Sequence, residues 1–408
     1  MDEKIIDSYA DLIVKVGANV QKGQYVVIRT SPCVEEFASL VAKKCYERGA
    51  KRVFVHWISS YLNKVDYEEA TTEELSSIPA FEEECHKFMA DNCPILIWLD
   101  ADDPDGLKGV DSKKVAAIRA AKNKVLGKYR DARDNKSQWC IAGVPSKEWA
   151  TKVFPSLSEE DAIEALWKAI LTTARALDGN GIKNWEDHEK DLKKRCSYLN
   201  SLNLRKLHYE SKTGTDFTVG LIPGVIFLGG GEKDLSNRFF QPNIPSEESF
   251  TSPMKGEAEG IVVASKPLAY NGQLIEDFTV RFHEGKAVEV TAKKGLEALQ
   301  GILTLDEGSA YLGECALVPF DSPINNTGIL FFNTLYDENA ACHLALGTGF
   351  PSLYPNFEKY TPEEIQKFGI NKSHSHVDFM IGDRYLNITG TTIDGKEIPI
   401  FRNGNWSF

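Results

Sequence analysis

The run QYVVIR (residues 24–29) decides the fold class of this chain, since it is a short apolar segment of the kind that forms a buried strand. Residues 5–16 before it and 35–48 after it carry apolar side chains at helical spacing, and Gly49 ends the second pattern. The run RVFVHW (residues 52–57) then repeats the strand signal. Strands that alternate with helices predict a mainly parallel sheet with helices on both faces.

The same alternation continues through the first half of the chain. Apolar runs recur at PILIWL (94–99) and SQWCIAG (137–143), and helical patterns follow at 158–177 and 185–199. Ser158 precedes an acidic first turn and suits the start of the first of these helices. No strand is followed by GxGxxG, GxxxxGKS or GxxxxGKT, the loops that bind nucleotide phosphates. We therefore expect this α/β layer to be a scaffold without a cofactor of its own.

Strand signals and turn glycines dominate the second half of the chain. Examples are KLHYE (206–210), DFTVGL (216–221), IVVA (261–264) and DFTVRF (277–282). A chain of 408 residues exceeds what one small core can organise, so two domains are the natural expectation. We predict an α/β scaffold domain over residues 1–200 and an α+β domain rich in antiparallel strands over residues 201–408.

The composition excludes several classes of protein. The net charge of −12 argues against nucleic acid or an anionic membrane as the main partner. The sequence has no apolar run of about 18 residues, so no membrane span is expected. It opens on MDEK without a basic patch and an apolar stretch, which argues against a secretory signal. Its eight cysteines lack CxxC spacing, as is typical of free thiols in a reducing cytosol, so we expect a cytoplasmic protein.

The second half of the chain also supplies a set of candidate metal ligands. Carboxylates and imidazoles are the groups that hold pairs of hydrolytic metal ions. They occur here in the segments SEESFT (246–251), GECA (313–316), DENAACH (337–343) and HVD (376–378). The candidates are Glu248, Glu314, His343, His376 and Asp378.

Strand geometry supports the pair of candidates in HVDFMIG (376–382). Side chains alternate between the two faces of a strand, so His376 and Asp378 share one face while the apolar residues share the other. The apolar face suits a core and leaves the polar face available to a metal ion. His374 lies on the same polar face and is a rival ligand, and a solvated strand face without a metal is the alternative.

Glu314 is the one charged residue in the apolar run YLGECALV (311–318). An isolated ionised carboxylate is costly to bury, so it needs a partner, and a divalent cation is a strong one. The alternative is a side chain that points to solvent at the end of the strand. Glu247 and Glu248 are the weakest candidates, because adjacent glutamates are usually a solvated loop.

His343 follows a predicted apolar strand at 328–333 and lies within a short helical pattern at 340–346. A lone histidine in an apolar stretch is usually a hydrogen-bonded core residue rather than a ligand. Asp337 and Glu338, just upstream, suit the start of a helix, where acidic side chains are favoured. They suit equally well a role in orienting His343 or a bound substrate.

Two common classes of hydrolase are excluded by missing motifs. The sequence has no GxSxG and no cysteine within a recognisable catalytic signature, so a nucleophilic hydrolase is not expected. HExxH is absent as well, which excludes a protease with a single zinc ion bound to one helix. The candidate ligands therefore carry the functional hypothesis.

Together, these segments resemble the aminopeptidase T and aminopeptidase S family of bacterial metallo-aminopeptidases over essentially the whole chain. The similar segments are YADLIVKVGANVQKGQ (9–24), GTDF (214–217), NIPSEESFTSP (243–253), LGE (312–314) and NTLYDENAACHLALG (333–347). The resemblance implies two divalent metal ions, and the ligands that it implies are Glu248, Glu314, His343, His376 and Asp378. It therefore favours His376 over His374 and Glu248 over Glu247.

The resemblance also implies a reaction. A hydroxide between the two metal ions would attack the first peptide bond of a substrate with a free N-terminus, so the enzyme would be a metal-dependent exopeptidase. We expect Glu314, at the centre of the ligand set, to bridge the metal ions and to act in catalysis. Zinc or cobalt is the expected metal, with manganese and magnesium as alternatives in a site of mixed oxygen and nitrogen ligands. Family members look like homodimers, so a homodimer is expected here too.

One position departs from the family pattern. A tyrosine thought to assist catalysis usually follows the HLALG segment, whereas this sequence has Phe350, which lacks the hydroxyl. Tyr354, four residues further on, is a candidate to replace it in catalysis. Two other functions stay open: a different dinuclear metallohydrolase such as a phosphoesterase, and a metal-binding relative that has lost peptidase activity. Phe350 is the motivating feature of the second.

Overall fold

The computed structural model describes residues 1–270 and 272–408, and the chain divides into two compact units. The N-terminal unit comprises Met1–His188 and Gly231–Pro245, and the C-terminal unit comprises Glu189–Gly230 and Ser246–Phe408. Each unit thus contains a segment from outside its main stretch of sequence. The division into domains at residues 1–200 and 201–408 stays a prediction.

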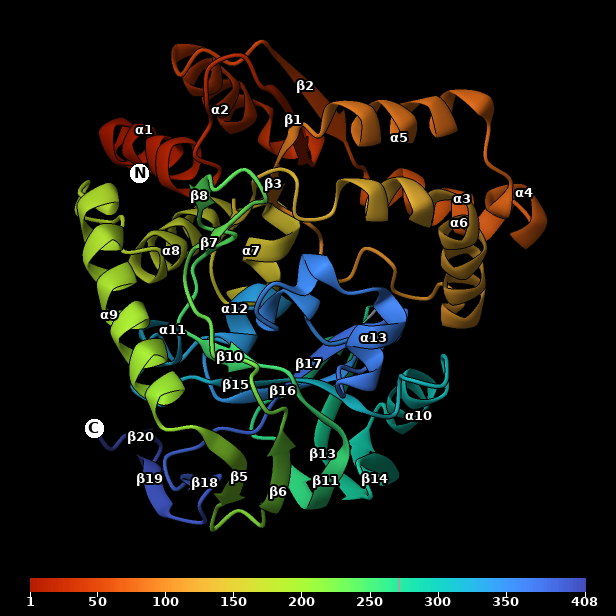
Figure 1. Ribbon diagram of the computed structural model, residues 1–408. Coiled ribbons are helices and arrows are strands. Elements are labelled where there is room, and N and C mark those ends of the chain that lie inside the picture. The colour runs from red at the N-terminus through yellow and green to blue at the C-terminus, as the bar shows by residue number, and fades with distance from the viewer. Residues whose placement is uncertain (271) are drawn as a thin grey trace. The chain divides into compact units, whose positions relative to one another are not determined.

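The N-terminal unit is built on a parallel sheet with the strand order β2-β1-β3-β4-β9 (Figure 1). Its strands are β1 (Tyr25–Thr30), β2 (Arg52–Trp57), β3 (Ile95–Asp100), β4 (Trp139–Gly143) and β9 (Asn243–Ile244). Val26, Ile28, Ile95 and Ile97 from the central strands are fully buried. Parallel strands form where crossover segments cover the sheet, and this is the arrangement that the alternating pattern predicts.

Helices connect these strands and lead into the C-terminal unit. They are α1 (Glu3–Leu12), α2 (Glu35–Glu47), α3 (Ser60–Glu69), α4 (Thr72–Ser76), α5 (Ala80–Asn92), α6 (Ser112–Arg133), α7 (Lys147–Val153), α8 (Glu159–Thr173) and α9 (Gly181–Ser201). The predicted start of α8 is confirmed, because Ser158 Oγ accepts a hydrogen bond from the Asp161 N–H at 3.2 Å. Within the described residues, no helix combines the length and the apolar character needed to cross a bilayer.

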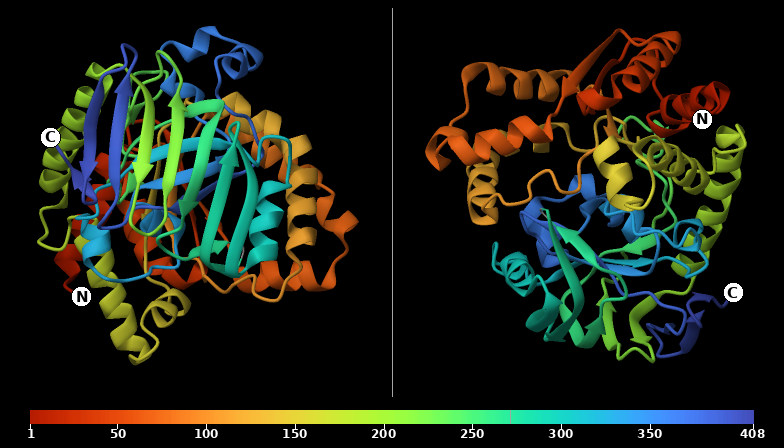
Figure 2. Two further views of the ribbon diagram at one scale, coloured as in Figure 1. Left: turned by 90° about the horizontal axis from the view of Figure 1, so that it is seen from below. Right: turned by 180° about the vertical axis from the view of Figure 1, so that it is seen from behind.

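The C-terminal unit contains a large antiparallel sheet with the strand order β12-β13-β11-β6-β5-β18-β19-β20, and β14 pairs with β13 (Figure 2, left). These strands are β5 (Leu204–Glu210), β6 (Asp216–Leu221), β11 (Pro253–Val263), β12 (Leu268–Tyr270), β13 (Gln273–His283), β14 (Lys286–Lys294), β18 (Asn387–Thr392), β19 (Glu397–Arg402) and β20 (Asn405–Trp406). The prediction of a second half rich in antiparallel strands is therefore confirmed.

A smaller antiparallel sheet, with the order β10-β15-β16-β17, lies in the same unit. Its strands are β10 (Ser249–Thr251), β15 (Leu312–Leu317), β16 (His343–Gly347) and β17 (His376–Met380). One face carries Cys315, Leu344, Val377 and Phe379, which join a core with Phe278 and other buried residues of the large sheet. The opposite face of the smaller sheet is therefore the one available for polar side chains.

Short elements complete the two units. The N-terminal unit also contains the hairpin of β7 (Glu232–Lys233) and β8 (Phe239–Phe240). The C-terminal unit also contains α10 (Leu296–Leu303), α11 (Pro323–Asn326), α12 (Thr334–Glu338) and α13 (Pro362–Lys367). Of these, α12 packs against β17 and so lies next to the smaller sheet.

Two predicted elements are wrong. Residues 328–333 form a loop rather than a strand, because Phe332 has a left-handed φ of 54° and the N–H groups of Phe331 and Asn333 bond to the Asp337 carboxylate. Residues 340–346 do not form a helix, since His343–Gly347 is the strand β16. That strand is buried on both faces, and a short run of apolar residues does not distinguish such a strand from a buried helix.

Replacing Leu344 with alanine tests the packing of the smaller sheet on the core. Leu344 is fully buried, so the Leu344→Ala change should destabilise the protein by about 2–5 kcal/mol. The measurement is the midpoint of urea unfolding followed by tryptophan fluorescence. Val288→Ala is the control, because Val288 is 53% exposed and its loss should cost less than about 0.5 kcal/mol. Equal midpoints for the two variants would contradict the packing.

Candidate metal centre

The register of the smaller sheet brings the predicted ligands onto one face. Glu314 on β15 pairs with Ala345 on β16, and Ala345 pairs with Asp378 on β17. His376 lies opposite Gly347, two residues along each strand, and His343 lies two residues from Ala345 in the other direction. Paired residues of antiparallel strands point to the same side of a sheet. All four polar side chains therefore share the face that points away from the core.

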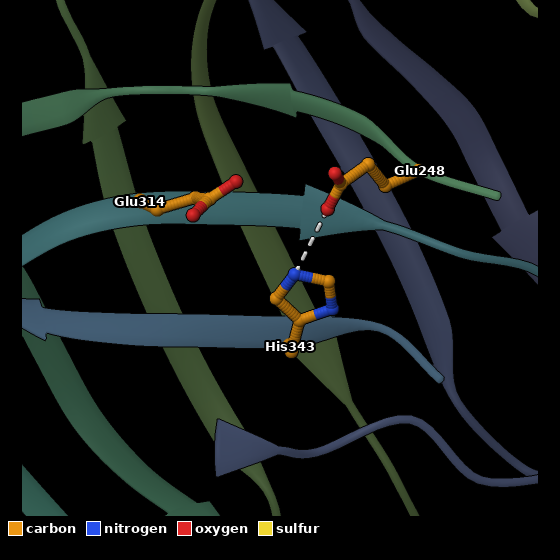
Figure 3. Close-up of side chains that lie close together, drawn as sticks. All are labelled: Glu248, Glu314 and His343. Carbon is orange, nitrogen blue, oxygen red and sulfur yellow. Dashed lines mark ion pairs between the residues drawn. The ribbon is translucent and has the colours of Figure 1, made fainter. Parts of the chain in front are cut away.

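Glu248 joins this face from the segment just before β10, which is hydrogen-bonded to β15. The ligand atoms form two groups, Glu248–Glu314–His343 and Glu314–His376–Asp378, and within each group they lie within 4.8 Å of one another. Figure 3 shows the first group, with the Glu314 carboxylate on β15 directed toward the other two side chains. Glu314 belongs to both groups, as a residue that bridges two cations must.

Short contacts link each imidazole to carboxylates. His343 Nε2 lies 3.2 Å from a Glu248 oxygen. His376 Nε2 lies 3.0 Å from a Glu314 oxygen and 3.3 Å from an Asp378 oxygen. The other ring nitrogen, Nδ1, lies 3.0 Å from the Ala341 carbonyl in His343 and 2.8 Å from the Thr348 carbonyl in His376. A carbonyl that accepts from Nδ1–H leaves Nε2 as the ligand atom, as in many metal sites.

Burial differs across the centre. Glu248, Glu314, His343 and Asp378 are buried, whereas the His376 side chain is 24% exposed. Buried acids favour their neutral forms. Burial, together with Glu248 and Asp378, raises the pKa of Glu314 to about 7, although His376 acts in the opposite direction. The two imidazoles therefore do not supply enough positive charge to balance the carboxylates of the centre.

The imidazoles respond to the same carboxylates. Burial alone would lower the pKa of His343, but the hydrogen bond to Glu248 and the nearby acids raise it to about 10. Burial favours the neutral form of Asp378, yet the charge of His376 outweighs it and lowers the pKa of this carboxyl. A hydrogen bond with Glu338 acts on the Asp378 carboxyl in the same direction. This donor set of carboxylate oxygens and imidazole nitrogens fits divalent cations such as zinc, cobalt or manganese.

Asn339 positions the segment that carries Glu248. Its Oδ1 accepts a hydrogen bond from the Glu247 N–H at 2.7 Å, and its Nδ2 donates to the Leu335 carbonyl at 3.0 Å. Its Nδ2 also lies 3.4 Å from a Glu338 oxygen. The Asn339 side chain is fully buried, so these groups have no alternative partner in water. One amide thus ties the Glu248 segment to the end of α12.

Gly313 lets the strand before Glu314 approach its neighbour. A Cβ at this position would lie 2.1 Å from the Thr348 carbonyl oxygen, which is a severe clash. That oxygen is the one that accepts from His376 Nδ1. The absence of a side chain at Gly313 therefore preserves the carbonyl that orients His376.

Glu338 is a further functional candidate. From the sequence it suited equally well the start of a helix and a role in orienting His343 or a substrate. It ends α12, and its neighbouring charges are Asp378, Glu248, His343 and Glu314. Burial and these acids raise its pKa well above the usual value for a glutamate. Glu338 thus faces the ligand cluster, although the two groups of ligand atoms found among the described residues do not include it.

The other residues named from the sequence lie around the centre. Glu247 is buried beside Glu248, whereas His374 is exposed and its N–H donates to Asp306. The Phe350 ring lies 5.1 Å from the His376 ring. Tyr354 stacks on Phe368 at 4.7 Å, within a small cluster of apolar residues beside α13. The catalytic roles of Glu314, Phe350 and Tyr354, and the ligand roles, stay predictions.

Comparisons with known proteins agree with this arrangement. The sequence model of the thermophilic metalloproteases (M29) matches residues 2–406. The chain belongs to the M29 metalloprotease family. Aminopeptidases of this family, AmpS and aminopeptidase T among them, are 36–43% identical to the chain, which confirms the predicted resemblance and makes the chain a metallo-aminopeptidase.

Individual members of the M29 family align over nearly the whole chain. Aminopeptidase AmpS of Bacillus subtilis (strain 168) is 43% identical over 404 residues, which are 99% of this chain and 98% of the relative. Aminopeptidase 2 of Geobacillus stearothermophilus is 40% identical over 407 residues, or 100% of this chain and 98% of the relative. The structure of wild-type AmpT from Thermus thermophilus superposes with a TM-score of 0.90 at 35% identity and covers 100% of both chains.

The role of Asn339 is open to a direct test. The Asn339→Ala change removes the acceptor of the Glu247 N–H and should weaken zinc binding by about 10–100-fold, as is usual for residues that hold a metal ligand in place. The measurement is calorimetric titration of the metal-free protein with zinc. Asn387→Ala is the control, because Asn387 also accepts one backbone N–H, at 3.0 Å, but on the large sheet. Unchanged zinc affinity in Asn339→Ala would refute the positioning role.

Proposed function

We propose that the chain is a metallo-aminopeptidase that removes the N-terminal residue from peptides with the help of two divalent metal ions. The observation that carries the proposal is the pair of ligand groups that share Glu314. Membership of a metalloprotease family supports the peptidase reaction, and the relatives named above are aminopeptidases. Glu248 and His343 would hold one ion, His376 and Asp378 the other, and Glu314 would contribute to both.

Residues of the chain prepare this centre for hydrolysis. Two divalent cations, when bound, lower the pKa of a water molecule and polarise a peptide carbonyl. The carbonyls of Ala341 and Thr348 hold the two imidazoles with Nε2 toward the carboxylates. Burial of Glu314 and its neighbours keeps the local dielectric low, so charges that develop during the reaction interact more strongly than in water.

An aminopeptidase must also recognise the free amine of its substrate, which carries a positive charge when protonated. Glu338 is the carboxyl group that faces the ligand cluster without belonging to either ligand group. In its ionised form, which nearby cations would favour, the side chain is complementary to an ammonium group. We therefore assign Glu338 to the amine of the substrate and leave the other five side chains to the metal ions.

Three features remain predictions from the sequence. They are zinc or cobalt as the metal, the homodimer, and the cytoplasmic location. Metal analysis of the purified protein and sedimentation velocity test the first two. Fractionation of the native cells tests the third.

Removing the metal ions, or the carboxylate shared by both groups, should abolish activity. Dialysis against a chelator should eliminate hydrolysis of leucine p-nitroanilide, and added zinc or cobalt should restore it. Glu314→Gln should lower kcat/KM by more than about 100-fold, because loss of a residue that merely supports a ligand already costs about 10–100-fold. The measurements are the metal-to-protein ratio and steady-state kinetics.

The results that would contradict the mechanism are specific. Activity that survives chelation, or a Glu314→Gln variant with normal turnover, would exclude the metal-dependent reaction. Hydrolysis of an aryl phosphate in place of the anilide would show a phosphoesterase instead.

Glu338→Gln should separate substrate binding from metal binding. The change keeps the shape of the side chain and removes its charge, so the metal content should stay at the wild-type value. Hydrolysis of leucine p-nitroanilide should fall by about 10–100-fold in kcat/KM, the range expected for one charged hydrogen bond. Glu363→Gln, at an exposed position in α13, is the control. A loss of metal in Glu338→Gln would instead make Glu338 a ligand.

A further inference from the structure

Two phenylalanine rings form an aromatic pair next to the metal centre. The rings of Phe250 and Phe350 lie 5.3 Å apart at an interplanar angle of 69°. Phe350 also contacts the His376 imidazole, with a centroid distance of 5.1 Å and an angle of 55°. Edge-to-face contacts of this kind favour a defined ring orientation. The pair therefore forms one apolar surface that ends at a proposed metal ligand.

The register of β10 puts Phe250 on the ligand face of the smaller sheet. Phe250 pairs with Ala316 on β15, and Ala316 pairs with His343 on β16. Paired residues share a face, so Phe250 lies in the same row as His343 and not on the core side. A core role accordingly does not account for this aromatic residue.

The backbone holds both rings in place. On the side of β10 that faces away from β15, Phe250 and Leu228 exchange two backbone hydrogen bonds, at 2.7 and 3.0 Å. The Phe350 N–H donates to Ser252 Oγ at 2.9 Å. Because Ser252 follows β10, this bond joins the segment of one ring to that of the other. The aromatic pair is therefore a fixed surface, and little order is lost when a ligand packs on it.

The pair lies on the open side of the centre. His376 is the one ligand of the five with substantial exposure, and both phenylalanines are partly exposed, whereas Glu248, Glu314, His343 and Asp378 are buried. A substrate that reaches the metal ions from solvent passes the exposed ligand. The side chain of its first residue is attached to the Cα next to the reacting carbonyl carbon. This side chain would therefore lie beside the apolar surface nearest to the metal centre.

We propose that Phe250 and Phe350 form the wall of the subsite for the side chain of the first residue of the substrate. The inference rests on the proposed aminopeptidase function and adds the class of substrate: peptides with an apolar N-terminal residue of the size of leucine or phenylalanine. An aromatic wall stabilises such a side chain by burying its surface, and it offers no partner to a carboxylate.

The test compares p-nitroanilides of leucine, phenylalanine, alanine and glutamate on the metal-loaded enzyme. The wild type should favour leucine and phenylalanine. Phe250→Ala should lower kcat/KM for leucine by about 10-fold or more, mainly through KM, because even one methylene group in an apolar pocket is worth about 10–200-fold. The same variant should change kcat/KM for alanine by less than about 3-fold, since alanine presents little surface to the wall.

Two further variants serve as checks. Phe350→Leu keeps an apolar side chain and should reduce the preference for leucine over alanine less than Phe250→Ala does. This milder variant keeps the test decisive if Phe250→Ala does not fold. Trp406→Leu is the matched control, because it removes a partly buried ring that contacts the buried Phe401 ring at 4.4 Å, and it should leave the preference unchanged.

Equal losses for the leucine and alanine substrates in Phe250→Ala would overturn the inference, because they would indicate damage to the metal centre. A wild type that hydrolyses none of the anilides would refute the proposed function but not yet the wall. In that case, calorimetric binding of leucine amide and alanine amide to the metal-loaded protein decides. Tighter binding of leucine amide that disappears in Phe250→Ala supports the wall, and equal affinities overturn it.

Discussion

Crowding of carboxylates in a buried place is the constraint on which the rest of this structure depends. Glu248 and Asp378 raise the pKa of Glu314, and these three acids together raise the pKa of Glu338. All four side chains lie largely out of water. Like charges at such positions repel, and two imidazoles do not compensate four acids. The arrangement becomes favourable only with further positive charge, which two divalent cations and a substrate ammonium group would supply. The same groups that make the metal-free centre unfavourable would thus favour the binding of cations.

The two faces of the smaller sheet differ in role: one packs in the hydrophobic core, and the other carries the crowded acids. Leu344, Val377 and Phe379 anchor one face in the core, so the strands have a stable position that does not depend on the ligands. On the other face, Ala345 lies between Glu314 and Asp378 in the register, and its small side chain leaves the space between the two acids open. Alternation of side chains along each strand therefore separates stability from chemistry within five or six residues.

The parts of this architecture that follow local periodicity could be predicted, and the parts that follow from distant contacts could not. The strand–helix alternation of the N-terminal unit and the shared face of His376 and Asp378 are local, and the structure has both. The loop at 328–333 and the strand β16 are set by the Asp337 carboxylate and by pairing with β15 and β17, which periodicity does not show. Asn339 bonds to a segment 92 residues away, so no local signal separates it from a helix-end asparagine.

The two ligand groups differ in their exposure to solvent, and they share Glu314. The group with Glu248 and His343 is enclosed, whereas the group with His376 borders the exposed side and the phenylalanine pair. A cation held by the enclosed group would exchange less readily with water, because Glu248, Glu314 and His343 are all buried. A cation held by the other group would border the partly exposed His376. Because Glu314 belongs to both groups, displacement of an ion bound in one group would alter the electrostatic field in the other. An ion in the enclosed group would thereby help to fix the geometry in which the open group meets a substrate.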